Sequence, residues 1–120
     1  MNSDNSLQHE YIGLEGAHCL ENDLNNLAVF YASGVRYIGI THFFDNEWGG
    51  SAHGVVRNGL TESGKELMHE MNDLNITNDL AHASPKVIVD VLALSLHPVL
   101  VSHKGVKVFV IINEIFQMHI

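Results

Sequence analysis

The sequence predicts an α/β fold built on parallel strands. Short apolar runs alternate along the chain with stretches of helical periodicity, which is the order of elements in a parallel sheet whose strands are joined by helices. The 120 residues make one domain at most and leave room for about four βα units. The predicted strands are Tyr11–Glu15, Arg36–His42, Ile76–His82 and Pro98–His103.

Three helices are expected between these strands. The first covers about Glu21–Ser33, where leucines recur at helical spacing, and Gly34 follows as a C-terminal cap. The second covers about Thr61–Asn75, and its stripe of Leu and Met residues indicates core packing rather than a cofactor site. The third begins at Ser84, which can act as N-cap, with Pro85 in the first helical position.

Two segments fall outside this alternation. The polar, glycine-rich stretch Phe43–Asn58 directly follows the second strand, and connections of this length usually serve a site. Its Trp48 fits a pocket-lining residue and a loop anchor equally well. Near the end of the chain, Lys104-Gly105 predicts a turn, while Val106–Ile112 fits either a further strand or a short buried helix.

Composition excludes several classes of protein. The net charge of −8 and the six basic residues argue against nucleic-acid binding and against a polybasic membrane anchor. The single cysteine, Cys19, cannot form an internal disulfide. The longest apolar run is too short to span a bilayer, and the N-terminus lacks the pattern of a signal peptide. We therefore expect a cytoplasmic protein with no nucleic-acid partner and no membrane segment.

Each predicted strand ends on a residue able to bind a metal or a proton. These residues are Glu15, His42, His82 and His103. In parallel β/α folds, side chains at the carboxyl ends of strands converge on one face, where the chemistry takes place. A carboxylate and two imidazoles can hold a zinc ion and leave a fourth position for water, which the metal activates for hydrolysis. Because His, Asp and Glu are abundant here, position alone leaves this site and chance placement both open.

The other polar residues near these positions carry weaker signals. Asp79 lies three residues before His82 in the same predicted strand, so the two side chains should point to opposite faces, and a structural role is expected for Asp79. His18 and Cys19 follow Glu15 and are expected to be packed or exposed, with a supporting role near a metal as the alternative. The remaining histidines are expected to be surface or satisfied core residues: His9, His53, His69, His97 and His119.

Six blocks of the sequence carry a more specific pattern. They are Leu14–His18, Arg36–His42, Asn46–Gly54, Asn58–Gly64, Asp79–Pro85 and Val101–His103. In this order and at this spacing they resemble the membrane (renal-type) dipeptidase family, peptidase family M19, particularly its bacterial members. The resemblance covers about Gly13–His103, some three-quarters of the chain.

The resemblance implies a fold, a reaction and a set of roles. The family is a (β/α)8 TIM barrel that uses two zinc ions to hydrolyse the peptide bond of dipeptides. Glu15 matches the glutamate that bridges the two metals, and His82 and His103 match the histidines that complete one zinc site. His42 matches a histidine that is not a ligand but contacts the dipeptide substrate and the tetrahedral intermediate.

The chain also departs from the family pattern. No His-x-Asp pair precedes Glu15, and the family's later arginine and aspartate do not occur before Ile120. Residues 104–120 form a divergent C-terminal end. Since a complete barrel needs at least about 200 residues, we expect residues 1–120 to form a single partial (β/α)8 TIM barrel with one zinc site mostly represented.

Two readings of such a chain remain. It is a zinc-dependent dipeptidase by resemblance, or it is a catalytically incompetent remnant or split-barrel piece that binds at most one metal. A homo-oligomer or a missing barrel half would then be its partner.

Overall fold

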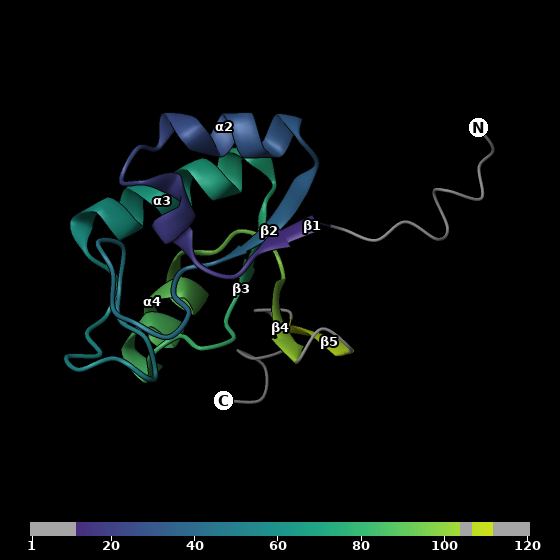
Figure 1. The fold of residues 1–120 in the computed structure, drawn as a ribbon. Coiled ribbons are helices and arrows are strands. Elements are labelled where there is room, and N and C mark those ends of the chain that lie inside the picture. Colours follow the sequence, from purple (N-terminus) through teal and green to yellow (C-terminus); the bar gives the residue numbers. More distant parts are fainter. Residues whose placement is uncertain (1–11, 104–106, 112–120) are drawn as a thin grey trace.

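The computed structural model describes residues 12–103 and 107–111, and its described side chains end at Ser102. Figure 1 shows the arrangement of the elements. In chain order they are β1 (Ile12–Leu14), the 3-10 helix η1 (Ala17–Leu20), α2 (Asn25–Ala32), β2 (Val35–Gly39), α3 (Glu62–Leu74), β3 (Thr77–Asp79), α4 (Pro85–Leu94), β4 (Val99–His103) and β5 (Lys107–Ile111).

The sheet has the predicted parallel strands. β1 to β4 pair in chain order and run parallel, with Gly13 beside Tyr37 and Gly39 beside Asp79. β5 pairs antiparallel with β4. The apolar segment near the end of the chain, for which the sequence allowed either a strand or a short helix, therefore contains a strand. The predicted turn at Lys104-Gly105 lies outside the described residues.

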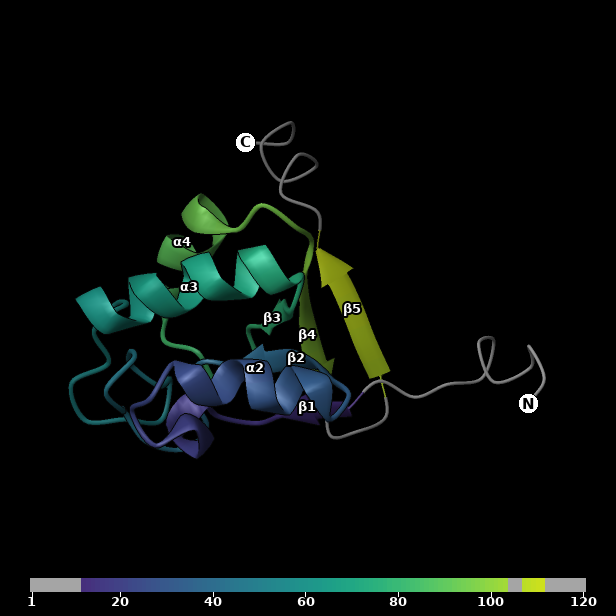
Figure 2. The same cartoon turned by 90° about the horizontal axis from the view of Figure 1, so that it is seen from above.

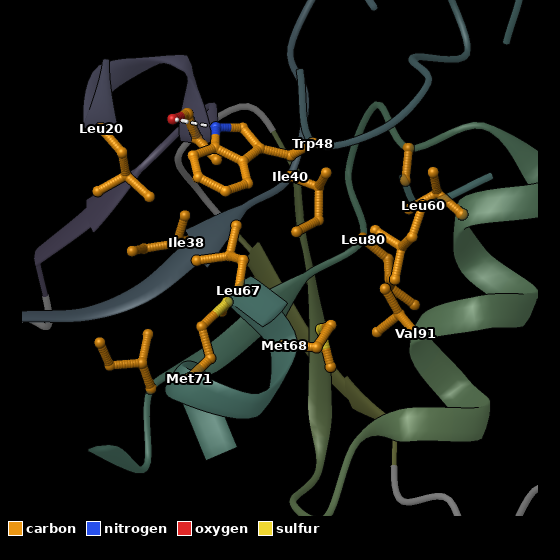
Figure 3. Packing of buried hydrophobic residues seen from close by; sticks show 14 of the residues in the cluster. Leu20, Ile38, Ile40, Trp48, Leu60, Leu67, Met68, Met71, Leu80 and Val91 are labelled. Carbon is orange, nitrogen blue, oxygen red and sulfur yellow. Dashed lines mark hydrogen bonds between the residues drawn. The ribbon is translucent and has the colours of Figure 1, made fainter. Parts of the chain in front are cut away.

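The three α-helices of the described chain lie along the same side of the sheet (Figures 1 and 2). α2 packs against α3, and α3 packs against α4. Apolar side chains from both layers fill the space between them (Figure 3), and the Leu and Met residues of α3 belong to this core, as predicted. In the described part of the chain, no helix has the length and apolar character needed to cross a membrane.

The starts of α3 and α4 are set by local capping, which was predicted for Ser84. The hydroxyl of Thr61 accepts a hydrogen bond from the Gly64 amide at 3.0 Å, and that of Ser84 accepts one from Val87 at 3.1 Å. Each bond satisfies an amide that would otherwise lack a partner in the first turn. Gly34 follows α2 with φ of 109°, a conformation that glycine adopts without steric cost.

The start of one helix and the ends of three strands differ from the prediction. The first helix begins at Asn25 rather than near Glu21, because Glu21 and Asn22 have positive φ angles of 54° and 60°, which a right-handed helix cannot contain. β1, β2 and β3 stop one to three residues before Glu15, His42 and His82. These three side chains therefore stand on the loops just beyond the strands.

Trp48 fixes the long connection between β2 and α3. Its side chain is only 1% exposed, and its indole Nε1 donates a hydrogen bond to the Ala17 carbonyl at 3.0 Å (Figure 3). Its own carbonyl accepts a hydrogen bond from the Thr61 amide at 3.0 Å. Of the two roles left open for Trp48, the structure shows the loop anchor.

Asp45 organises the outer part of the same loop. One carboxylate oxygen accepts a hydrogen bond from the Ser51 amide at 2.9 Å, and the other accepts one from Val56 at 2.9 Å. The Arg57 amide approaches both oxygens, at 3.3 and 3.4 Å. These bonds, that from Ser51 first and that from Val56 second, lower the pKa of Asp45 below its ordinary value of 3.8, because each favours the ionised carboxylate.

We predict that Gly64→Ala destabilises the fold, although alanine in a helix is ordinarily better than glycine by about 1 kcal/mol. A Cβ atom at Gly64 would overlap the carbonyl oxygen of Trp48, which is backbone and cannot move aside cheaply. We expect the free energy of unfolding to fall by about 1–3 kcal/mol, measured by urea denaturation.

The matched control is Glu66→Ala, an exposed position on the same helix, for which we expect a change within about 0.5 kcal/mol. A Gly64→Ala variant as stable as the wild type would contradict the close packing of α3 on the Trp48 loop.

We also predict a pH-dependent effect of Asp45→Asn, which removes the charge and keeps the shape. Because the folded pKa of Asp45 is depressed, its stabilising contribution is complete above the unfolded value of 3.8 and is lost as the pH falls through the lower folded pKa. Urea denaturation should therefore show the variant to be less stable than the wild type at neutral pH, with a smaller difference well below pH 3.8. The control is Asp73→Asn, an exposed carboxylate on α3; a pH-independent Asp45 difference would refute the idea.

Candidate metal and substrate site

A pocket of about 590 Å³ opens on the sheet face that the helices do not cover, at the carboxyl ends of the parallel strands. Side chains alternate between faces along a strand. Ile38 and Asn78 lie on the helix side, where the Asn78 amide contacts Met68, so their neighbours face the pocket. The pocket is lined by Gly13, Glu15, Tyr37, Gly39, Thr41, His42, Phe43, Asp79, Ala81, His82, Val101 and Ser102.

Glu15 and His42 meet at the edge of this pocket. The His42 Nε2 atom lies 3.4 Å from a Glu15 carboxylate oxygen. The Glu15 side chain is 77% exposed, so this contact is worth little as a salt bridge, and the carboxylate is accessible to a metal ion. His18 and Cys19, which follow on η1, are exposed.

His82 faces His42 across the pocket. The two rings are arranged edge to face, with centroids 4.6 Å apart. The backbone of His82 has φ of 66°, a left-handed conformation that is uncommon outside glycine. Two hydrogen bonds to its carbonyl hold it there, from the Thr41 hydroxyl at 3.0 Å and from the Ala52 amide at 2.8 Å.

His53 is a neighbour of His82 that the sequence did not reveal. Its Nε2 atom lies 3.0 Å from Nδ1 of His82, a hydrogen-bond distance. His53 is exposed, as expected for a surface residue, but its ring has a partner 29 positions away in sequence. Its place in the long loop after His42 was the single available signal. By contrast, His69 is exposed and His97 is satisfied by the Asn72 carbonyl, as expected.

The pKa of His82 lies below its ordinary value of 6.5. Partial burial is the main cause, because it disfavours the charged ring, and repulsion from His42 and then His53 acts in the same direction. The lowered pKa favours the uncharged His82 ring at neutral pH. An uncharged imidazole has the lone pair that a metal ligand needs.

Asp79 connects the segments that carry two of the predicted ligands. Its buried carboxylate accepts hydrogen bonds from the Ala81 amide at 2.9 Å and from the Ser102 amide at 3.1 Å. Ala81 immediately precedes His82, and Ser102 immediately precedes His103. The structural role of Asp79 is as expected, and it consists of fixing the end of β3 against β4. The expectation that Asp79 and His82 point to opposite faces is wrong: β3 ends at Asp79, so strand alternation does not extend to His82, and both side chains line the pocket.

The structure describes the side chains of two of the three predicted metal ligands. Glu15 and His82 line the pocket, whereas His103 is the last residue of β4 and its side chain lies outside the described part. Among the described side chains, no group of three or more His, Cys, Asp or Glu is arranged to hold a metal ion. The donor types present, a carboxylate and an uncharged imidazole around one pocket, fit zinc.

Comparisons with known proteins agree with this fold. A model of the membrane dipeptidase family, peptidase family M19, matches residues 4–112. Dipeptidase tcpJ of Claviceps purpurea is 38% identical over 96 residues, covering 78% of this chain and 23% of the relative. Human dipeptidase 3 is 37% identical over 102 residues, covering 80% of this chain and 21% of the relative.

Solved structures give the same result. The probable dipeptidase PvdM from Pseudomonas aeruginosa superposes with a TM-score of 0.70 at 31% identity, covering 74% of this chain and 24% of that one. A metallo peptidase from Rhodobacter sphaeroides, liganded with a phosphinate mimic of the dipeptide L-Ala-D-Ala, gives a TM-score of 0.62 at 33% identity, covering 78% of this chain and 28% of that one.

This chain spans less than a third of the length of these relatives. The prediction of a partial (β/α)8 TIM barrel with parallel strands is confirmed by the sheet and by these structural neighbours. With the family match over most of its residues, the chain belongs to the membrane dipeptidase family, peptidase family M19.

Proposed function

We propose that the chain carries one zinc site and the substrate-contacting histidine of a dipeptidase, which hydrolyses the peptide bond of dipeptides. The observation that carries this proposal is that Glu15, His42 and His82 line one pocket at the carboxyl ends of the parallel strands. The proposed substrate class, dipeptides, is supported by the dipeptidase relatives and by the dipeptide mimic bound to the Rhodobacter sphaeroides protein.

Glu15, His82 and His103 would hold the zinc ion. The exposed carboxylate of Glu15 and the uncharged ring of His82 are suited to this role, and His103 is assigned to it by its place in the family motif. A zinc ion bound there supplies Lewis acidity, which activates water and polarises the peptide carbonyl. Asp79 keeps the backbone segments of the two histidines at a fixed separation through its bonds to Ala81 and Ser102.

His42 would act on the substrate. Its Nε2 atom reaches the edge of the pocket beside Glu15, and the Phe43 ring packs against its ring with centroids 4.0 Å apart, which restricts its rotation. An N–H donor fixed in this place can stabilise the negative charge that develops on the carbonyl oxygen as water attacks.

A second candidate function follows from the open sheet. The described strands form a four-stranded parallel sheet with one antiparallel strand, and the chain matches about a quarter of its relatives' length. Such a piece could bind one metal and turn over no substrate unless a second copy or another barrel half completes the pocket. The cytoplasmic location remains a prediction from the sequence.

We predict that the purified chain, loaded with zinc and dialysed, retains about one zinc ion per molecule. Glu15→Gln and His82→Ala should each lower the retained zinc, measured by mass spectrometry of the metal, because each removes a donor atom. His69→Ala, at an exposed position on α3, is the matched control and should retain the wild-type amount. Equal zinc content in the wild type and both ligand variants would exclude this metal site.

We predict that His42→Ala keeps the zinc content of the wild type and loses hydrolysis of L-Ala-D-Ala by a factor of about 10²–10³, the usual effect of removing one oxyanion donor. Hydrolysis is measured as release of free alanine at saturating zinc. Loss of zinc in this variant would instead make His42 a ligand and contradict its assignment. Zinc binding without turnover by the wild type favours the barrel-piece function.

A further inference from the structure

The loop that follows His42 is attached to the His82 segment at several points. The Ala52 amide donates to the His82 carbonyl at 2.8 Å, and the Ser84 amide donates to the Gly50 carbonyl at 3.0 Å. Ser51 also forms an isolated antiparallel bridge with Ala83. The backbone on both sides of the imidazole is therefore held by residues of one loop.

The side chain of His53 completes this attachment. Its amide is held by the Ser51 hydroxyl at 3.0 Å, and the same hydroxyl donates to the His42 carbonyl at 2.5 Å. From this position Nε2 of His53 reaches Nδ1 of His82 at 3.0 Å, and the two ring centroids lie 5.1 Å apart. Ser51 therefore fixes the backbone of His53, and the His53 ring extends from there to the ring of His82.

The hydrogen bond between Nε2 of His53 and Nδ1 of His82 contains one proton, so either His53 or His82 is its donor. If His53 donates, Nδ1 of His82 accepts, and the remaining hydrogen of His82 lies on Nε2. Both nitrogens of His82 are then occupied and neither can bind a metal. If His82 donates from Nδ1, its Nε2 keeps a free lone pair. Only the second arrangement is compatible with His82 as a ligand.

We propose that His53 is a positioning residue that accepts the Nδ1–H hydrogen bond of His82 and so holds His82 in the tautomer whose Nε2 lone pair is free. The use of this lone pair by zinc rests on the proposed function; the hydrogen bond itself does not. Partners of this kind orient metal-binding histidines, and their loss typically weakens metal affinity by about 10–100-fold.

The first test uses the metal-free protein. Long-range ¹H–¹⁵N NMR spectra of the histidine rings assign the tautomer of His82, with a His82→Gln sample to identify its signals. We expect the Nδ1–H tautomer in the wild type and a shift towards Nε2–H, the form preferred by free histidine, in His53→Ala. A wild-type His82 in the Nε2–H form, or a tautomer unaffected by His53→Ala, would overturn the proposal.

The second test measures the zinc dissociation constant by competition with a chromogenic chelator. We expect His53→Ala to weaken zinc binding by about 10–100-fold. His53→Gln should restore most of the affinity, because its amide oxygen can accept the same hydrogen bond, and His69→Ala should match the wild type. This rescue separates positioning from a general loss of fold, which ¹H–¹⁵N backbone spectra also report.

The two tests keep the two proposals apart. If His82→Ala loses zinc and His53→Ala does not, the role of His53 is wrong and the zinc site stands. If the wild type binds no zinc, the proposed function is wrong, and the tautomer of His82 in the metal-free protein still decides whether His53 accepts its hydrogen bond.

Discussion

The burial of Trp48 is the constraint on which the rest of the site depends. The connection between β2 and α3 is long and polar, and Trp48 joins it to the apolar core. The indole donates to the η1 carbonyl of Ala17, and the Trp48 carbonyl accepts from Thr61, the N-cap of α3. One residue thus fixes the loop relative to the segment that follows β1 and to the start of α3.

Carboxylates in this region have two different uses. Asp45 and Asp79 accept hydrogen bonds from backbone amides. Those to Asp45 stabilise the loop, and those to Asp79 join the end of β3 to β4. Glu15 makes one long contact with His42 and is otherwise open to solvent. A carboxylate that accepts no backbone hydrogen bond keeps its oxygens available for a metal ion, which agrees with the role proposed for Glu15.

The sequence predicted those features whose causes are local. The starts of α3 and α4 follow from Thr61 and Ser84, whose capping partners are three residues away. The convergence of Glu15, His42 and His82 on one pocket follows from the common direction of the strands, which the alternation of elements predicts.

Features with distant causes could not be predicted in this way. The left-handed backbone of His82 is held by contacts such as that of the Thr41 hydroxyl with the His82 carbonyl, 41 residues apart in sequence. His53 likewise pairs with a distant residue, His82, which lies 29 positions further along the chain. Periodicity alone could not decide that β5 is a strand, and it gives no information that β5 runs against β4 rather than along it.

The left-handed backbone at His82 lowers the stability of the fold at the position that carries a proposed metal ligand. For a residue with a side chain this conformation costs roughly 1–2 kcal/mol, whereas glycine adopts it freely. The backbone bonds from Thr41 and Ala52 offset this cost. Glycine at this position would remove this backbone cost, but it would also remove the imidazole that is proposed to bind zinc.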